Sequence, residues 1–281
     1  MRVFNKQAEL STFLQSVAQS GLVGFVPTMG ALHQGHLTLL KQSVAENTTT
    51  VVSIYVNPTQ FNNVADLKSY PRTLELDLEK IKFVDSNIVV FTPETADIYG
   101  PEAKSDTFNF DGLDLQMEGK FRPGHFNGMA TIVKRLLDIV KPNRAYFGEK
   151  DFQQLQIVRK LVQKHHMEVQ IIACPIVREE NGLAMSSRNE RLSAADRAEA
   201  AFIFKILCDA QLRFSKHSIK QVKSWVYQKF QKNRKFKLEY FEIADQTTLK
   251  SALRKSNNKK YRAFIAVFMG EVRLIDTIAL N

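Results

Sequence analysis

The chain has 281 residues, of which 44% are hydrophobic and 24% charged, the composition of a soluble globular protein long enough to bury a sizeable core. It has no apolar run near the ~20 residues that a transmembrane helix requires, and no continuous apolar stretch after Met1 that is typical of a signal peptide. Cys174 and Cys208 are too few for a disulfide framework or a thiolate metal site. We therefore expect a protein of the reducing cytoplasm, outside the membrane.

The net charge of +10 is concentrated in the C-terminal third. Residues 186–281 hold 20 Lys or Arg against 9 Asp or Glu, whereas residues 1–185 are nearly neutral. A basic region can bind nucleic acid, draw anionic small molecules towards a cleft, or form a solvated surface. These basic residues are dispersed and lack a strong cluster of aromatic residues for base stacking, so we favour the solvated surface and expect no nucleic-acid partner.

The first 177 residues alternate predicted helices and strands. In chain order the predictions are a helix over 5–20, a strand over 22–26, a helix from 37, a strand over 50–56, a helix that follows residues 70–73 and reaches about 83, strands over 87–91 and 108–110, a helix over 129–140, a strand over 144–147, a helix over 152–164 and a strand over 169–177. Apolar strands that alternate with helices are typical of a parallel sheet. We therefore predict a Rossmann-like, doubly wound α/β fold with right-handed crossovers.

The pattern changes after residue 178. Ser193, with Asp196 three residues later, is typical of a helix N-terminus, and we expect this helix to reach about residue 213. The predictions that follow are a helix over 218–231 and strands over 238–243, 263–269 and 272–278. We therefore predict two domains, a doubly wound domain over residues 1–178 and a smaller, basic α+β domain over residues 179–281.

The segment P-T-M-G-A-L-H-Q-G-H, from Pro27 to His36, is the most distinctive part of the chain. It follows an apolar run and precedes leucines at helical spacing, so it predicts a buried strand, a tight turn and a helix. A helix N-terminus offers unpaired N–H groups and the positive end of the helix dipole, which suits phosphate. Two histidines three residues apart at this turn can face one ligand together and donate to developing negative charge.

Three further loops are expected beside this turn, because the carboxyl ends of parallel strands are where open α/β sheets bind ligands. They are residues 57–60, 148–154 and 185–188. Lys150 can place an ammonium group against a phosphate, and Arg188 can hold phosphate oxygens in two places. Gln60 and Gln154 carry amides that can orient hydroxyls and a carboxylate.

Asp77, in the helix predicted after residues 70–73, could reach a magnesium ion that bridges phosphates, directly or through water. Each of these residues, taken singly, is also compatible with an ordinary surface position. The chain contains neither G-x-x-x-x-G-K-[ST] nor G-x-G-x-x-G, so neither a P-loop nor the dinucleotide fingerprint accounts for phosphate binding. His33 and His36 have no third His or carboxylate at ligand spacing, which argues against a metalloenzyme.

Together these segments resemble the pantoate–β-alanine ligase (pantothenate synthetase) family of the nucleotidyltransferase superfamily, which carries an H-x-G-H motif. The matching words are P-T-M-G-A-L-H-Q-G-H at 27–36, Y-V-N-P-T-Q-F at 55–61, Y-P-R-T-L at 70–74, F-R-P-G-H-F-N-G at 121–128, F-G-E-K-D-F-Q-Q at 147–154 and P-I-V-R-E-E-N-G-L-A-M-S-S-R-N at 175–189. They run in the family's order and extend over most of residues 3–192. The C-terminal third is similar in length and layout only.

The resemblance implies an ATP-dependent ligase that forms pantoyl adenylate and pyrophosphate from pantoate, and then pantothenate and AMP with β-alanine. It implies Mg²⁺ with ATP, and a homodimer. Its implied catalytic residues are His36, His33, Lys150 and Arg188. The implied ATP-binding residues are Met29, Gly30, Ala31, Leu32, His33, Gln34, Gly35, His36, Gly148, Glu149, Lys150, Asp151, Val177, Met185, Ser186, Ser187 and Arg188. Asn57, Gln60 and Gln154 would bind pantoate or β-alanine, and Asp77 the metal.

Three positions depart from the family's usual pattern. Asn62–Asp66 replaces a segment that often contains Pro and Glu, residue 76 is Leu where an acidic residue is frequent, and Asn127 stands where Asp or Arg is frequent. Two other functions stay open. One is a nucleotidyltransferase that transfers AMP to a different, phosphate-bearing acceptor. The other is an RNA-binding protein that uses the basic third and whose affinity would fall steeply with salt.

Overall fold

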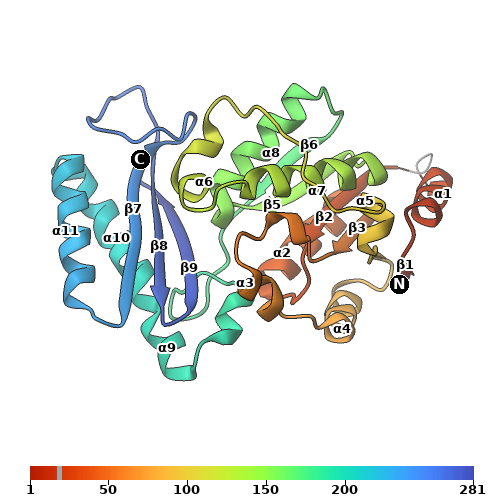
Figure 1. The fold of residues 1–281 in the computed structure, drawn as a ribbon, viewed down its shortest axis with the longest axis horizontal. Coiled ribbons are helices and arrows are strands. Elements are labelled where there is room, and N and C mark those ends of the chain that lie inside the picture. Colours follow the sequence, from red (N-terminus) through yellow and green to blue (C-terminus); the bar gives the residue numbers. More distant parts are fainter. Residues whose placement is uncertain (18–20) are drawn as a thin grey trace. The chain divides into compact units, whose positions relative to one another are not determined.

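Six strands form one parallel sheet in the computed structural model, which describes residues 1–17 and 21–281. They are β1 Arg2–Phe4, β2 Val23–Thr28, β3 Thr49–Ile54, β4 Val89–Phe91, β5 Arg144–Gly148 and β6 Gln170–Cys174. Their order in the sheet is β1-β4-β3-β2-β5-β6 (Figure 1). The predicted doubly wound α/β fold is confirmed, and β1, which the sequence did not predict, pairs with β4 at its edge.

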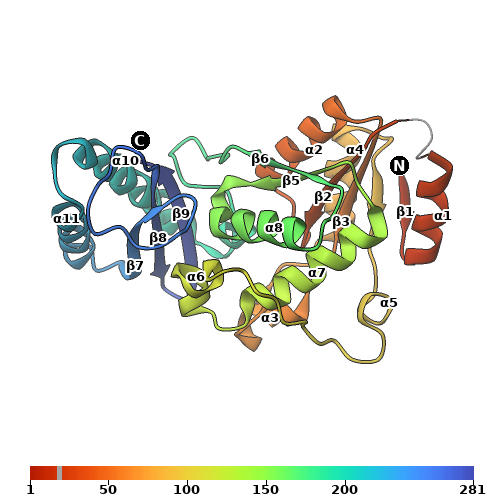
Figure 2. The ribbon, with the colours of Figure 1, turned by 90° about the horizontal axis from the view of Figure 1, so that it is seen from above.

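Helices cover both faces of this sheet. The helices of the compact unit that contains this sheet are α1 Gln7–Val17, α2 Gln34–Glu46, α3 Val64–Ser69, α4 Leu74–Val84, α5 Thr95–Tyr99, α7 His125–Val140 and α8 Phe152–Lys164, whereas α6 Met117–Phe121 belongs to a second unit. Figure 2 shows α2 and α4 on one face and α7 and α8 on the other. Val26, Leu40, Val52 and Ile81 pack the core between the sheet and the α2–α4 layer. The predicted helix over 5–20 is observed to Val17, and its last three residues lie outside the described part.

The strand order reverses between β2 and β5, the neighbouring strands from which the chain departs in opposite directions. Ligands of open α/β sheets bind beyond the carboxyl ends of the strands at such a switch point. β2 ends at Thr28, directly before the H-x-G-H turn, and β5 ends at Gly148, directly before Glu149–Asp151. The topology therefore brings the ends of the two strands that lead into the predicted ATP-binding segments next to each other.

The predicted strand over 108–110 is wrong. This segment has no regular secondary structure, and backbone N–H groups in and before it donate to side chains of α7. Asp106 N–H donates to Thr131 Oγ1 (2.8 Å) and Phe108 N–H donates to Asn127 Oδ1 (3.1 Å). Alternating aromatic residues favoured a strand, and the side chains of α7 supply the hydrogen bonds that a neighbouring strand would have provided.

The contacts of the chain divide it into two compact units. Unit 1 comprises residues 1–111, 122–148 and 154–175 and contains the six-stranded sheet. Unit 2 comprises residues 112–121, 149–153 and 176–281. Two short segments of the first part of the chain thus group with the C-terminal part. The predicted boundary at residue 178, between an ATP-binding domain and a C-terminal domain, stays a prediction.

Unit 2 contains an antiparallel sheet of β7 Phe236–Asp245, β8 Tyr261–Met269 and β9 Val272–Ala279, in that order. The apolar faces of α10 Ala201–Lys216 and α11 Ile219–Lys232 complete its core. The predicted helix from Ser193 is two helices, α9 Ala194–Glu199 and α10, which are separated at Ala200. Over the described residues, no helix is long and apolar enough to cross a membrane.

Gly128 permits a close approach between α7 and the 3-10 helix η2, Pro58–Gln60. A Cβ at this position would lie 2.1 Å from the carbonyl oxygen of Thr59 and 2.8 Å from Gln60 N. Because both are backbone atoms, a side chain here must displace one element. The absence of a side chain at Gly128 therefore allows the backbone of Thr59 and Gln60 to lie against α7.

We predict that Gly128→Ala lowers the free energy of unfolding by about 1–3 kcal/mol, the range for inserting an atom into a packed contact. Urea denaturation measures this change. Gly148→Ala is the matched control, because a Cβ there meets no atom within 4 Å. Equal unfolding midpoints for the two variants would contradict the close-packing account.

Candidate functional site

The two histidines of H-x-G-H cap the helix that follows them. His33 is the N-cap of α2, and its Nδ1 accepts a hydrogen bond from Gly35 N–H (3.1 Å). His36 Nδ1 accepts from His33 N–H (3.3 Å), so the two side chains form a reciprocal capping box. The ring centroids are 4.0 Å apart. The predicted strand, turn and helix are therefore present, with both imidazoles at the start of the helix.

The capping bonds determine which ring nitrogen carries the proton. In a neutral imidazole one nitrogen donates and the other accepts, and here both Nδ1 atoms accept from the backbone. The proton of each neutral ring therefore lies on Nε2. This makes His33 and His36 hydrogen-bond donors at the positive end of a helix dipole, which suits a phosphate or a developing negative charge.

The turn between β2 and α2 is held by α4. The Asp77 carboxylate is fully buried, and its two oxygens accept hydrogen bonds from Ala31 N–H (2.8 Å) and Leu32 N–H (2.7 Å). Lys80, three residues later, donates to the carbonyl oxygen of Leu32 (2.7 Å). Gly30 and Ala31 both have positive φ, at 77° and 49°. The turn therefore has a defined backbone conformation before any ligand is considered.

These contacts bear on the predicted metal role of Asp77. Both carboxylate oxygens already accept from backbone amides, and the side chain has no exposed surface. Mg²⁺ requires near-octahedral oxygen ligands and usually retains several waters, whereas this carboxylate is away from solvent and is already bound by two backbone amides. Asp77 does not fit a direct metal ligand. In the described part of the chain, no group of three or more His, Cys, Asp or Glu could hold a metal ion.

Asn57 and Gln60 lie together in unit 1, beside Met29. Asn57 is 1% exposed and donates from Nδ2 to Gln60 Oε1 (3.1 Å) and to the carbonyl oxygen of Gly128 (3.1 Å). Gln60 Nε2 donates to Met29 Sδ (3.0 Å). Asn57 is thus committed to orienting the Gln60 amide. The Gln60 Nε2 group donates to a thioether sulfur, a weak acceptor that a substrate oxygen can replace.

Two residues that the sequence did not single out support this pair. Tyr99 O–H donates to Asn57 Oδ1 (2.6 Å), and the His125 ring makes a hydrogen bond with the Gln60 carbonyl oxygen (2.8 Å). Burial raises the pKa of Tyr99 to about 12, so this hydroxyl stays a donor over the physiological range. His125 lies inside the family word at 121–128, which was a signal without an assigned role. Tyr99 has no comparable sequence signal.

The segment Glu149–Asp151 forms a 3-10 turn in unit 2. Arg262 donates to Glu149 Oε2 (3.0 Å), and its guanidinium lies 4.1 Å from the centre of the Phe152 ring. Lys150 Nζ lies 4.0 Å from Asp151 Oδ2. The buried Arg262 thus contacts the side chains of Glu149 and Phe152, which precede and follow Lys150 in the sequence.

Val177 and Met185 are neighbours in unit 2. Met185 N–H donates to the Val177 carbonyl oxygen (3.0 Å), and Ser186 Oγ accepts from Arg188 N–H (3.3 Å) at the start of the 3-10 helix η5, Ser187–Arg191. The predicted Met185–Arg188 segment is thus a capped turn. The hydroxyl groups of Ser186 and Ser187 and the guanidinium group of Arg188 therefore lie on the same capped turn.

Glu179 and Asn189 hold this turn, and neither had been assigned a role. Asn189 donates to Glu179 Oε1 (2.8 Å) and to the Ala184 carbonyl oxygen (3.1 Å), and Arg197 donates to Glu179 Oε2 (2.8 Å). Burial alone would raise the pKa of Glu179, but the hydrogen bonds from Arg197 and Asn189 outweigh it and leave the pKa below its ordinary value. Glu179 is therefore ionised at neutral pH.

The predicted site residues thus form two sets. Unit 1 brings together Met29–His36, Asn57 and Gln60, with Asp77 behind the turn, and it also contains Gly148 and the half-buried Gln154. Unit 2 brings together Val177 and Met185–Arg188, and it contains Glu149–Asp151. Each set is organised within its own unit by the contacts described above.

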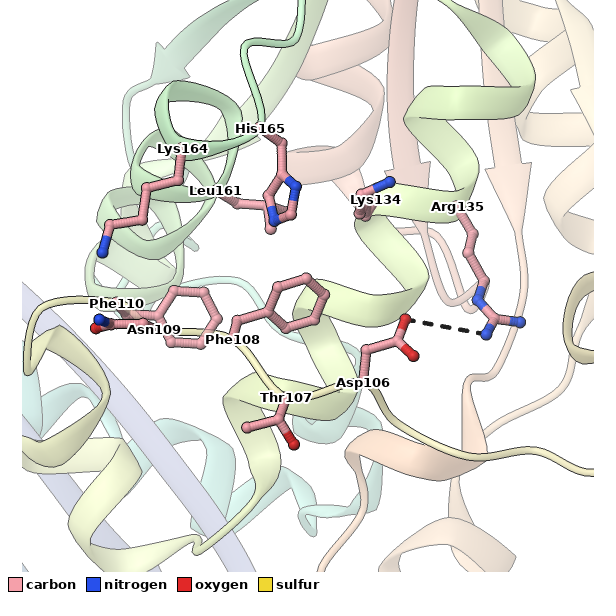
Figure 3. Close-up of a pocket in the computed structure, with 10 residues that line it drawn as sticks. All are labelled: Asp106, Thr107, Phe108, Asn109, Phe110, Lys134, Arg135, Leu161, Lys164 and His165. Carbon is pink, nitrogen blue, oxygen red and sulfur yellow. Dashed lines mark ion pairs between the residues drawn. The ribbon is translucent and has the colours of Figure 1, made fainter.

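A cavity of about 590 Å³ in unit 1 is not part of either set. Its walls are Asp106, Thr107, Phe108, Asn109, Phe110, Lys134, Arg135, Leu161, Lys164 and His165 (Figure 3). Asp106 and Arg135 form an ion pair at 4.0 Å on its edge. None of the predicted catalytic or binding residues lines it, so this cavity is not the candidate site.

A family model described as pantoate–β-alanine ligase matches residues 2–279. The chain belongs to the pantoate–β-alanine ligase family. A pantothenate synthetase of Flavobacterium psychrophilum is 56% identical over 282 residues, and one of Christiangramia forsetii is 50% identical, each alignment covering 100% of both chains. The resemblance inferred from the six sequence words is confirmed.

Solved structures of the family agree with the fold. The pantothenate synthetase of Thermus thermophilus is 35% identical, with a TM-score of 0.90 over 100% of this chain and 99% of its own. The pantoate–β-alanine ligase of Francisella tularensis, 36% identical with a TM-score of 0.82, covers 100% of this chain and 98% of its own. That structure is described as a complex with β,γ-ATP and β-alanine.

We predict that the Tyr99 hydroxyl titrates near pH 12, because burial disfavours its anion. Below the ordinary tyrosine pKa of about 10 both folded and unfolded states keep the proton, and the contribution of Tyr99 to stability is complete. That contribution is lost as the pH rises from about 10 towards 12. The difference in tyrosinate absorbance between the wild type and Tyr99→Phe isolates this group, and a transition near pH 10 would contradict its burial.

Proposed function

We propose that the protein joins pantoate to β-alanine with ATP and forms pantothenate, AMP and pyrophosphate through a pantoyl adenylate. Full-length membership of the ligase family supports the overall reaction, and the Francisella tularensis complex supports ATP and β-alanine as substrates. The observation that carries the chemistry is the capping of α2, which leaves His33 and His36 as Nε2–H donors.

In the first step, a carboxylate oxygen of pantoate attacks the α-phosphorus of ATP and pyrophosphate leaves. Negative charge accumulates on the oxygens around the transferred phosphorus, and fixed donors stabilise it without having to reorganise. We assign this role to His33 and His36, assisted by Lys150 and Arg188. Met29–His36, Gly148–Asp151, Val177 and Met185–Arg188 are the proposed ATP-binding residues.

Gln60 and Gln154 are the proposed partners of pantoate and β-alanine, with Asn57 orienting Gln60. Gln60 Nε2 donates to a thioether sulfur, so a carboxylate or hydroxyl oxygen of the substrate can take over that donor at low cost. In the second step, the β-alanine amine attacks the acyl carbon of the adenylate. The acyl carbon–oxygen bond breaks, AMP leaves with that oxygen, and the amine loses its proton.

Mg²⁺ is expected to accompany ATP on its phosphates and waters, as is usual for this ion. It would neutralise phosphate charge, and none of the steps assigned to the protein requires a residue of this chain to bind the metal.

We also propose that residues 1–178 bind ATP and pantoate, that residues 179–281 form a lid, and that the protein is a cytoplasmic homodimer. Sedimentation equilibrium, which measures the mass in solution, tests the dimer.

The order of product release tests the ligation. With ATP and pantoate alone, we predict pyrophosphate release that stops near one turnover, because the adenylate stays bound. AMP should appear only once β-alanine is added. Continuous ATP consumption that is indifferent to both acids would contradict the proposal. Transfer of AMP to a phosphate-bearing acceptor without free AMP would support the alternative nucleotidyltransferase.

We predict that His36→Ala or Lys150→Ala lowers kcat by about 100-fold or more with little change in the KM for ATP, because both groups act on the charge of the transition state. Steady-state kinetics with saturating pantoate measure both constants. Lys164→Ala is the control, since Lys164 lies on α8 beside Asp111 and outside both sets. A wild-type kcat in either site variant would remove that residue from the mechanism.

A further inference from the structure

We propose that Asp77 is a positioning residue that sets the backbone of the turn before His33, and that it is not a ligand of magnesium. The inference rests on the proposed function insofar as His33 and His36 are taken as the donors to the α-phosphate. It adds a residue on a different helix, α4, to the machinery that prepares those donors.

The carboxylate is placed for backbone binding. Its two oxygens accept from consecutive amides, Ala31 N–H and Leu32 N–H, at 2.8 and 2.7 Å. Thr73 Oγ1, one helical turn earlier, donates to the same Oδ2 at 3.3 Å. A charged acceptor roughly doubles the strength of each bond, and burial away from water strengthens it further. These three donors leave the carboxylate committed to the turn.

The conformation of the turn requires such support. Ala31 has φ of 49°, a left-handed conformation that residues with a Cβ adopt at a cost and keep only where the surroundings enforce it. The preceding Gly30 has φ of 77°, and a Cβ there would lie 3.1 Å from Asp77 Oδ2. Glycine thus lets the carboxylate approach, and the carboxylate in turn holds the strained residue that follows.

Lys80 holds the next peptide unit, on the C-terminal side of Leu32. Its Nζ donates to the Leu32 carbonyl oxygen at 2.7 Å, one turn beyond Asp77 on α4. α4 therefore binds both the N–H and the C=O of Leu32, the residue directly before the N-cap His33. Any shift of this peptide would rotate the start of α2, and with it the two imidazoles that cap it.

This arrangement also separates two sets of hydrogen-bond donors at the turn, the backbone amides and the imidazoles. The Ala31 and Leu32 N–H groups point at a carboxylate, so the negative charge of Asp77 is satisfied inside the protein. We assign the donors for an anionic ligand to the imidazole Nε2–H groups of His33 and His36 instead. A buried carboxylate beside a phosphate site is tolerable only because backbone dipoles face it.

The test compares Asp77→Asn with Glu75→Gln, an exposed carboxylate in the first turn of the same helix. Asparagine keeps the size of the side chain but turns an NH₂ group towards one of the two amides. We expect kcat to fall about 10- to 100-fold, the effect of a displacement near 1 Å on oriented groups. The KM for ATP and the Mg²⁺ concentration for half-maximal activity should stay within about twofold. Glu75→Gln should match the wild type.

A second variant guards against misfolding of the first. Lys80→Met removes an exposed side chain that donates to the Leu32 carbonyl oxygen, and we expect a smaller loss of kcat, about threefold or more, with the same unchanged Mg²⁺ dependence. A wild-type kcat in Asp77→Asn, or a loss that is restored by raising Mg²⁺, would overturn the inference, and the second result would make Asp77 a metal ligand.

An NMR measurement separates this inference from the proposed reaction. With Ala, Leu and His labelled, Asp77→Asn should move the Ala31 and Leu32 amide protons upfield and shift the ring signals of His33 and His36, whereas Glu75→Gln should move none of them. Unchanged signals would overturn the positioning role even if the ligase is active. If neither the wild type nor Glu75→Gln makes pantothenate, the ligation fails while these shifts still decide the role of Asp77.

Discussion

The N-terminus of α2 is capped by the same two side chains to which the chemistry is assigned. His33 Nδ1 and His36 Nδ1 satisfy backbone N–H groups that would otherwise be unpaired at a helix start. Because Nδ1 of each neutral ring accepts a hydrogen bond from the backbone, the ring proton lies on Nε2. The same two hydrogen bonds therefore stabilise the helix start and make the two rings donors through Nε2. A side chain that only donates would not cap the helix, and one that only accepts would not stabilise phosphate charge.

The supporting residues follow a common pattern, in which a buried polar group fixes the backbone or amide beside a functional group. Asp77 binds the turn before the histidines, Asn57 binds the Gln60 amide, and Glu179 with Asn189 binds the Met185–Arg188 turn. Such groups are costly to bury unless they are paired, and both carboxylate oxygens of Asp77 and of Glu179 accept hydrogen bonds. The pairing restricts each functional group to one orientation, which is what electrostatic catalysis requires.

The sequence predicted the elements that have strong local signals. The H-x-G-H turn was found because an apolar run, a Gly turn and leucines at helical spacing stand in direct succession. α8 was predicted with both ends correct, at Phe152 and Lys164. By contrast β1, with three residues, is too short to show a period, and the break at Ala200 leaves no signal because alanine favours helix on either side.

The supporting residues could not be predicted, for a physical reason. Tyr99 and Asp77 act on residues 42 and 46 positions away, and a single buried contact at such a separation leaves no periodicity in the sequence. Asp77 was expected to meet a metal because an acidic residue on a helix looks the same whether it faces a cation or two backbone amides. Only the fold reveals which of them lies opposite the carboxylate.

The measurement that tests this account most directly is the fate of the pantoate carboxylate oxygens. If the carboxylate attacks the α-phosphorus and the amine then breaks the acyl carbon–oxygen bond, pantoate labelled with ¹⁸O in its carboxylate must deliver one labelled oxygen to AMP. Mass spectrometry of AMP after complete conversion should show this transfer, with one labelled oxygen left in pantothenate. AMP without label, formed together with pantothenate, would contradict an adenylate built on the H-x-G-H turn.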